Sequence, residues 1–236
     1  MTRTIATLAI AVSCLPAPAR AQQTALTEAH LKSAEIEIPK LVDLLAIKPG
    51  TTVADVGAGF GAWTMALSKV VGANGRVYAT EIGAAQLAAL REAVERERLT
   101  NVTVVEATAA NVNLPPACCD AILIRDVYHH VTNPEQMVRG VTAALKPGGR
   151  LAVMDFPPRA NSEVPKGVPA NRRGHGVPAE IVESEFGAVL TRIRTIPDWS
   201  PESQPASLYL VLFQKPPATT GGGAQGGITM RKQPSQ

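Results

Sequence analysis

The feature that most constrains this chain is a glycine-rich stretch between a predicted strand and a predicted helix. Residues 53–61 are Val-Ala-Asp-Val-Gly-Ala-Gly-Phe-Gly. The apolar residues 52–56 predict a strand, and residues 62–71 predict a helix closed by Gly72. A strand that passes through glycines into a helix is typical of open α/β sheets, which bind ligands at the carboxyl ends of their strands. The glycines let the backbone approach such a ligand closely.

Strands and helices alternate along the rest of the chain. We expect strands at residues 76–81, 102–106, 121–127 and 151–156, and helices at residues 84–98 and 134–145. This alternation predicts a parallel, doubly wound α/β sheet with right-handed crossovers.

The segments on either side of this core carry further signals. An amphipathic helix precedes the first strand and includes Leu41 and Leu45, and Pro39 should break or kink it. A Pro-, Gly- and Arg-rich loop follows at 157–176, and then a helix at 177–187. The last two predicted strands, 189–196 and 208–213, suit an antiparallel hairpin at the sheet edge.

The two ends of the chain lie outside the predicted domain, 22–215. Residues 1–21 carry Arg3, a short apolar stretch and the small-residue pattern Ala-Arg-Ala before Gln22, which predicts a cleaved signal peptide. The apolar stretch is too short for a membrane span, so we expect a periplasmic or secreted protein without stable membrane insertion. A lipid anchor at Cys14 is the weaker alternative. Residues 216–236 are rich in Gly and Pro and predict a disordered tail.

Composition argues against a nucleic-acid partner. The formal net charge is only +3, the basic residues are scattered, and aromatic residues make up 4% of the chain. After signal cleavage only Cys118 and Cys119 remain, and adjacent cysteines bridge only in a strained geometry, so we expect no disulfide framework. A turn of small residues is the simpler interpretation of this pair, and a site of paired thiols is the alternative.

The spacing of the glycines indicates the class of ligand. The stretch has the form D-x-G-x-G-x-G, whereas a dinucleotide fingerprint is G-x-G-x-x-G and a phosphate-binding loop continues into Gly-Lys-Ser/Thr. Asp55 would repel a pyrophosphate but suits a cationic ligand with an amine, such as S-adenosyl-L-methionine (SAM). Glu81 ends the second strand, where a carboxylate can accept hydrogen bonds from ribose hydroxyls. This spacing disfavours a nicotinamide-dependent oxidoreductase.

With these motifs the chain resembles the class I SAM-dependent methyltransferases, over roughly residues 41–215. The glycine stretch resembles the family's first motif, Glu81 its ribose-binding acid, and residues 145–151 its turn into the fifth strand. The resemblance implies a Rossmann-like sheet of seven strands, mostly parallel with an antiparallel C-terminal hairpin. The closest likeness is to small bacterial proteins with a signal peptide. The cofactor-binding residues implied in this way are Asp55, Gly57, Ala58, Gly59, Gly61, Glu81, Ile82, Thr108, Ala109 and Asp126.

One position departs from the family pattern. Many members place an Asp after the third strand to contact the adenine amine, and Thr108 stands there in this chain. The candidate catalytic residues are Tyr128, His129 and His130, which follow the fourth strand, although a structural role for the His pair is the preferred alternative. Because the two histidines are adjacent, we expect at most one to face the substrate. His129, His130 and His175 lack a typical metal-ligand spacing, so no metal is expected.

The sequence therefore predicts a SAM-dependent methyltransferase that acts on an unidentified small molecule. The alternative is an exported protein of the same fold that binds a ligand without catalysis, because SAM is made in the cytosol. Residues 157–176 are a candidate substrate lid, and their basic residues suit an anionic acceptor or are simply solvated. Trp63 is expected to pack on the sheet rather than on the substrate.

Overall fold

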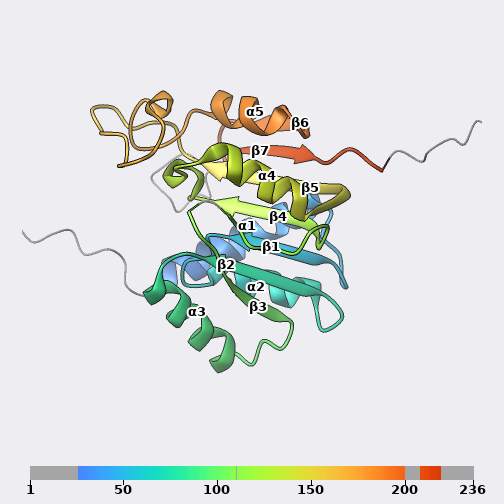
Figure 1. Ribbon diagram of the computed structural model, residues 1–236. Helices are drawn as coiled ribbons and strands as arrows, with labels where there is room; N and C mark the ends of the chain where they lie inside the picture. The colour runs from blue at the N-terminus through green and yellow to red at the C-terminus, as the bar shows by residue number, and fades with distance from the viewer. Residues whose placement is uncertain (1–25, 110, 200–207, 219–236) are drawn as a thin grey trace, which may run out of the picture.

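The structure is a computed structural model that describes residues 26–109, 111–199 and 208–218. It is a three-layer α/β arrangement in which helices cover both faces of one twisted sheet (Figure 1). The predicted signal peptide, 1–21, and most of the predicted C-terminal tail lie outside the described residues.

The sheet has seven strands in the order β3-β2-β1-β4-β5-β7-β6. The strands are β1 (Thr52–Val56), β2 (Arg76–Glu81), β3 (Val102–Glu106), β4 (Cys119–Arg125), β5 (Leu145–Asp155), β6 (Thr191–Ile196) and β7 (Tyr209–Gln214). The first five are parallel, and β7 runs antiparallel to both β5 and β6. This order confirms the predicted Rossmann-like sheet and its C-terminal hairpin. The chain order reverses between β1 and β4, and ligands of such sheets bind at that switch point.

Five α-helices and two short 3-10 helices are described. They are α1 (Glu28–Leu45), α2 (Ala62–Val71), α3 (Ala84–Arg96), α4 (Pro134–Ala144), α5 (Ala179–Gly187), η1 (Tyr128–His130) and η2 (Ala170–Arg172). None of these described helices has both the length and the apolar character needed to cross a membrane.

The strands alternate their side chains between two hydrophobic cores, as the pleat of a sheet requires. In β4, Ile122 and Ile124 pack with residues of α4 and α5, whereas Ala121 and Leu123 pack with residues of α1 and α2. All four β4 residues are fully buried. A strand covered on both faces reads as a continuous apolar run, which is why β4 could be predicted from sequence.

Helix α1 continues through Pro39, so the predicted break is wrong. Pro39 has no N–H to donate to the carbonyl of Glu35, one turn earlier in the helix. Both residues lie on the exposed side of the helix, so that carbonyl can accept a hydrogen bond from water instead. On the opposite side Ile38, Leu41 and Leu45 are buried in the core. Each buried aliphatic side chain contributes about 1.5–3 kcal/mol, which outweighs one lost hydrogen bond.

The start of β5 also differs from the prediction. Residues 146–149 were expected to form a turn, but β5 begins at Leu145, directly after α4. The reason is long-range pairing with the end of the chain's last strand. The N–H of Gly148 donates to the carbonyl of Lys215 at 2.9 Å, and the N–H of Lys215 donates to Gly149 at 2.8 Å.

The two cysteines contradict the expectation that no disulfide forms. Cys118 and Cys119 are joined by a disulfide between neighbouring residues at the start of β4. Cys119 is fully buried, and Cys118 is partly buried. The register of β4 against β5 shifts between Cys119 and Ala121, so the pair lies at an irregular point of the sheet.

Candidate active site

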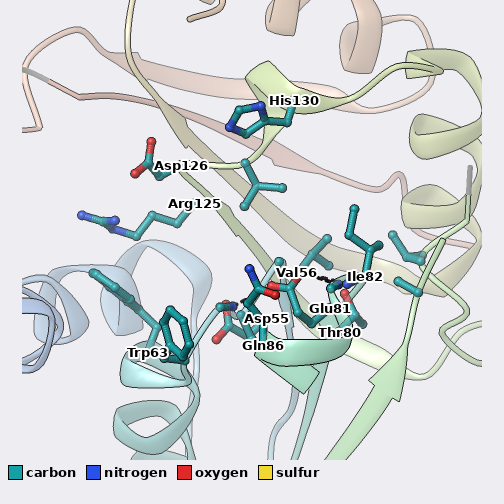
Figure 2. Close-up of a pocket in the computed structure, with 18 of the residues that line it drawn as sticks. Asp55, Val56, Trp63, Thr80, Glu81, Ile82, Gln86, Arg125, Asp126 and His130 are labelled. Carbon is teal, nitrogen blue, oxygen red and sulfur yellow. Dashed lines mark hydrogen bonds between the residues drawn. The ribbon is translucent and has the colours of Figure 1, made fainter. Parts of the chain in front are cut away.

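A cavity of about 710 Å³ lies at the carboxyl ends of the central strands. Its walls come from the loops that follow β1, β2, β3 and β4, together with the start of α1. This volume falls within the range of about 300–1,000 Å³ that is usual for small-molecule sites. Figure 2 shows Asp55 and Glu81 on one side of the cavity, and Arg125, Asp126 and His130 on the other.

The glycine loop after β1 forms the floor of this cavity. The N–H groups of Gly57 and Ala58 both donate to the carbonyl of Thr80 at 2.9 Å, which ties the loop to β2. Gly57 has φ +73°, and a Cβ there would meet a Val127 methyl carbon at 2.4 Å. Gly59 has φ +54° but open space around its missing Cβ. Gly57 thus allows tight packing, whereas Gly59 leaves room for a ligand.

Asp55 is the most desolvated acid that lines the cavity. The residue is 3% exposed, and its carboxylate accepts a hydrogen bond from the Thr64 hydroxyl at 2.6 Å. Burial raises the pKa of Asp55 to about 6, and the Thr64 hydrogen bond and the Arg125 charge only partly oppose this rise. A carboxylate in this position would be stabilised by a bound cation.

Glu81 closes the glycine loop from the second strand. One carboxylate oxygen accepts the N–H of Gly59 at 2.9 Å, and the other accepts the N–H of Ile82 at 2.8 Å. Beside it, the Ile82 side chain is 60% exposed at the cavity edge, an unusual position for a large aliphatic residue. An acid next to an exposed apolar surface suits a sugar hydroxyl followed by a flat ring.

One buried polar atom of the cavity also lacks a partner. The hydroxyl oxygen of Thr80 is buried and has no hydrogen-bond partner among the described residues. Buried polar groups are nearly always hydrogen-bonded, so an unsatisfied hydroxyl in the lining of a cavity is consistent with a polar ligand. Together with the desolvated Asp55, this orphaned hydroxyl fits a ligand that carries both a cation and polar groups.

The opposite wall is built by the residues after β4. Asp126 has φ +57°, a left-handed conformation that Asp tolerates better than most residues. Its N–H donates to the carbonyl of Met154 at 2.8 Å, which holds this bend. The residue is accessible from the cavity, yet partial desolvation and then the nearby Asp155 carboxylate raise its pKa.

Arg125 brings a positive charge to the cavity, and Glu37 neutralises it. The guanidinium forms two hydrogen bonds to the Glu37 carboxylate, at 2.7 and 3.0 Å. The Trp63 indole donates to the same carboxylate at 2.9 Å and lies 3.8 Å from the guanidinium carbon, measured to the ring centroid. Both charged side chains are at most 9% exposed. This network joins α1, α2 and β4. Because Glu37 neutralises Arg125, the three acids Asp55, Glu81 and Asp126 make the electrostatic potential of the cavity negative.

Comparison with known proteins bears on the same region. Residues 54–153 match the family model described as "Methyltransferase domain". Among curated relatives, a ubiquinone/menaquinone biosynthesis C-methyltransferase, UbiE, of Pseudomonas paraeruginosa is 30% identical over 126 residues. That alignment covers 53% of this chain and 49% of the relative, so the chain spans about half the length of the curated proteins it matches.

Solved structures extend the likeness beyond the matched segment. A SAM-dependent methyltransferase from Aquifex aeolicus has a TM-score of 0.56 and 22% identity, covering 80% of this chain and 99% of that one. A Haemonchus contortus phosphoethanolamine N-methyltransferase 2 in complex with SAM has a TM-score of 0.62 and 17% identity, covering 77% and 52%. Identities this low show a shared fold only, whereas the family model matches the sequence of residues 54–153. Residues 54–153 are therefore similar to a methyltransferase domain, and the surrounding fold is that of SAM-dependent methyltransferases.

The fold gathers nearly all of the predicted cofactor residues around one cavity. Gly61 is the exception, since the other nine predicted residues line the cavity and Gly61 does not. Gly61 is instead the N-cap of α2, with φ +87°, and a Cβ there would meet Leu90 at 2.7 Å. The lack of a side chain at Gly61 allows the turn into α2 and leaves room for Leu90 of α3.

Thr108, the departure from the family pattern, also lines this cavity, as does its neighbour Ala109. Thr108 accepts the N–H of Asn111 with its hydroxyl oxygen at 3.0 Å, and its own N–H donates to the carbonyl of Asn111 at 2.9 Å. This turn places Thr108 in the lining of the same cavity as Ile82 and Glu81.

The three candidate catalytic residues are placed differently. His130 lines the cavity, whereas Tyr128 and His129 are not among the described residues of its lining. Tyr128 is fully buried, and its hydroxyl donates to Glu185 of α5 at 2.6 Å. Glu185 is also held by Arg172 through two hydrogen bonds of 2.9 and 3.1 Å. This position favours a structural role for Tyr128.

The expectation that at most one of the adjacent histidines faces the cavity agrees with its lining, which includes His130 but not His129. The two rings nevertheless lie close together, with centroids 4.0 Å apart. The expectation for Trp63 needs correction. Trp63 packs against the core beneath α1 and α2, as expected, but it lines the cavity as well.

The loop at 157–176 does not cover the cavity. None of its residues is among the lining residues of the described cavity. Its ends are joined by a hydrogen bond from the Val177 N–H to the carbonyl of Phe156 at 3.0 Å, and Arg172 is buried against α5. Arg173 pairs with Glu180 of α5 at 3.3 Å. The loop is thus tied to α5 in this conformation rather than placed as a lid.

Sequence reasoning missed several residues that line or shape the cavity. His30 of α1 lines it, although α1 lies far from the glycine loop in sequence. Glu37 carries no motif, and only the fold brings it to Arg125. The available signal was weak: a Glu at position 37 is an acid on the apolar side of a predicted amphipathic helix. A buried acid of that kind needs a partner.

Proposed function

We propose that the protein transfers the methyl group of SAM to a small-molecule acceptor in this cavity. The observation that carries the proposal is Asp55, an acid at the glycine loop that is only 3% exposed and whose buried charge a bound cation would stabilise. Glu81 and the exposed Ile82 lie on the adjoining strand end, where they suit a ribose and a flat ring. The matched methyltransferase family model supports the same ligand.

SAM supplies an already activated methyl group, so the protein's part is mainly to bind, orient and exclude water. Asp55 and Glu81 hold one side of the cavity, and the neutralised Arg125 avoids repelling a cation. Asp126 and His130 form the other wall, where the acceptor would lie (Figure 2). Desolvation lowers the pKa of His130 to about 4, so its ring is neutral at pH 7 and can accept a hydrogen bond from an acceptor N–H or O–H.

The charge of the acceptor is a finer part of the proposal. The basic residues of the 157–176 loop do not line the described cavity in this conformation and would contact an anionic acceptor only after the loop moves. The Arg159 guanidinium carbon lies 4.6 Å from the centroid of the Phe156 ring. Two others are less available, because Arg172 and Arg173 pair with Glu185 and Glu180. Arg159 and Lys166 are therefore the candidates for contacting an anionic group.

We also propose that the chain is exported, on the strength of the signal-like residues 1–21. Export supports the alternative function, a protein of this fold that binds a ligand without catalysis, because SAM is made in the cytosol. The two functions share the cofactor site and differ in turnover. Methyl transfer needs a vacant acceptor wall beside the cofactor, and the accessible Asp126 and His130 favour the first function.

The decisive experiment is calorimetric titration of the protein with SAM and with S-adenosylhomocysteine. We expect binding in the micromolar range, and a loss of about tenfold or more in Asp55→Ala and in Glu81→Ala, because each change removes a charge-assisted contact. Gln136→Ala is a matched control, since Gln136 lies on α4 outside the cavity lining.

The calorimetric titration and an acceptor panel together distinguish three outcomes: methyl transfer, binding without catalysis, and no binding of SAM. Binding followed by methyl transfer to members of an acceptor panel supports the methyltransferase. Tight binding without turnover across the panel supports the non-catalytic alternative. A folded wild-type protein that binds neither compound would overturn the assignment of this cavity to SAM.

A further inference from the structure

Three of the chain's four histidines come together beside the cavity wall. His129 and His130 belong to η1, and His175 comes from the loop that precedes α5. The ring centroid of His175 lies 5.1 Å from that of His129 and 5.5 Å from that of His130. One ring nitrogen from each of the three lies within 4.8 Å of the others. We call these three residues the histidine cluster.

The central histidine is held by a carboxylate that fixes its orientation. The Nδ1 of His129 lies 2.9 Å from one oxygen of Asp155, and the other oxygen accepts the His129 N–H at 3.0 Å. Asp155 is fully buried at the end of β5, and it also accepts the N–H of Phe156 at 2.9 Å. With Nδ1 engaged, Nε2 is the nitrogen of His129 left to bind something else. A carboxylate behind a histidine is the usual support of a metal ligand.

A second observation points to a ligand at the same place. The Nε2 of His175 is buried and has no hydrogen-bond partner among the described residues. Such an atom loses its water without compensation unless another group bonds to it. Together with the spacing of the three rings, this unpartnered nitrogen fits a group that bonds to several imidazoles at once.

We propose that His129, His130 and His175 bind one divalent transition-metal ion, with zinc as the best match. Imidazole nitrogens suit zinc, copper, nickel and iron, whereas magnesium and calcium prefer oxygen ligands. Three histidines with a free fourth position are the ligand set of many catalytic zinc sites. Zn–N bonds of about 2.0–2.1 Å require nitrogens about 3.4 Å apart, so the rings would draw together from their present spacing. Small rotations of the exposed His130 and of the loop-borne His175 provide that change.

The position of the histidine cluster relates it to the acceptor side of the cavity. His130 is the member that lines the cavity, so a bound ion would lie at the wall opposite Asp55. There it would attract an oxygen of the acceptor and lower the pKa of a hydroxyl, which makes a better nucleophile for methyl transfer. This last step rests on the proposed function, whereas metal binding itself does not.

The test is metal binding by the full-length chain, purified without a histidine tag and stripped with a chelator. We expect one equivalent of Zn²⁺ to bind with a dissociation constant below the micromolar range, measured by competition with a chromophoric chelator. Co²⁺ should bind in its place and give the intense visible absorption of a four-coordinate site. His130→Ala and His175→Ala should each weaken Zn²⁺ binding by about 100-fold and abolish the cobalt spectrum.

The matched control is His30→Ala, because His30 lies at the same cavity but outside the histidine cluster. It should leave Zn²⁺ affinity and the cobalt spectrum unchanged. Unchanged metal-free circular dichroism in every variant shows that the effects do not come from unfolding. The proposal is overturned if the wild type binds less than one equivalent, or if His130→Ala and His175→Ala bind as the wild type does. In that case the cluster is a packing arrangement of rings around Phe156. The metal-binding assay contains neither SAM nor a methyl acceptor. Failure of Zn²⁺ to bind would therefore leave the proposed methyltransferase function untouched.

Discussion

Asp55, the acid proposed to stabilise a bound cation, destabilises the ligand-free fold when it is ionised. Its pKa is about 6 in the folded protein and 3.8 as a free side chain. The folded state therefore holds the proton more tightly, so the contribution of Asp55 to stability is greatest below pH 3.8 and is lost as the pH rises through 6. Above that pH the ionised, buried carboxylate destabilises the ligand-free protein by up to about 3 kcal/mol.

We therefore predict that Asp55→Asn raises the stability of the ligand-free protein at pH 7.5 by about 1–3 kcal/mol, because the amide needs no charge desolvation. The amide oxygen can still accept the hydrogen bond from Thr64. Urea denaturation at pH 7.5 and at pH 4 measures this effect, and the difference between variant and wild type should shrink at the lower pH. A variant that is less stable at pH 7.5 would contradict this account of Asp55.

At the scale of single residues, the sequence predicted the cofactor side of the cavity better than the acceptor side. Asp55, Gly57 and Gly59 follow one another in a local motif, so their spacing alone carries the information. Glu37 contributes through its contact with Arg125, which lies 88 positions away in the sequence. His175 contributes through its contact with His129, which lies 46 positions away. No local pattern encodes such pairs, because the fold creates them.

At the scale of elements, α1 both covers the sheet and completes the cavity. Glu37 on its buried face binds Arg125 of β4 and the Trp63 indole of α2. If Glu37 is removed, Arg125 remains buried with an uncompensated charge, a change that typically costs about 3–5 kcal/mol. That charge would also oppose a cationic ligand, since Arg125 is close enough to influence Asp55.

We predict that Glu37→Gln lowers the free energy of unfolding by about 2–4 kcal/mol and weakens SAM binding by about tenfold or more. Denaturation and calorimetry on the same preparations measure both effects. Glu35→Gln is the matched control, because it makes the same chemical change two residues away on the exposed face of α1. Equal SAM affinities in Glu37→Gln and the wild type would show that the neutralisation of Arg125 does not matter for the cofactor.

Elements whose signals are local were predicted well, and those that depend on distant pairing were not. The bounds of β1, β2 and β3 agree with the hydrophobic pattern of the sequence. The early start of β5 depends on Lys215, which lies more than sixty positions away. Helix α1 continues through Pro39 because its buried side chains pack in the core and stabilise it. The helix propensity of single residues does not include that packing energy.

At the scale of the whole molecule, every described residue lies after the predicted cleavage point. The N-cap of α1 is Thr27, whose hydroxyl accepts the N–H of His30 at 3.3 Å, and Leu26 is the first of the described residues that lines the cavity. A cut after Ala21 would remove none of the described residues. A form that begins at Gln22 would therefore keep every described residue of the fold.

We predict that a bacterial host that exports the full-length chain accumulates a form that begins at Gln22, because the Ala-Arg-Ala pattern ends at Ala21. Intact-mass measurement of the protein from the periplasmic fraction tests this directly. Arg20→Pro with Ala21→Leu is the control, since a large residue before the cut should block cleavage and leave the longer mass. The processed form should bind SAM and unfold at the same temperature as protein produced from Gln22, because both contain every described residue. A protein that stays in the cytosol at full length would instead remove the problem of SAM supply and strengthen the catalytic function over the binding alternative.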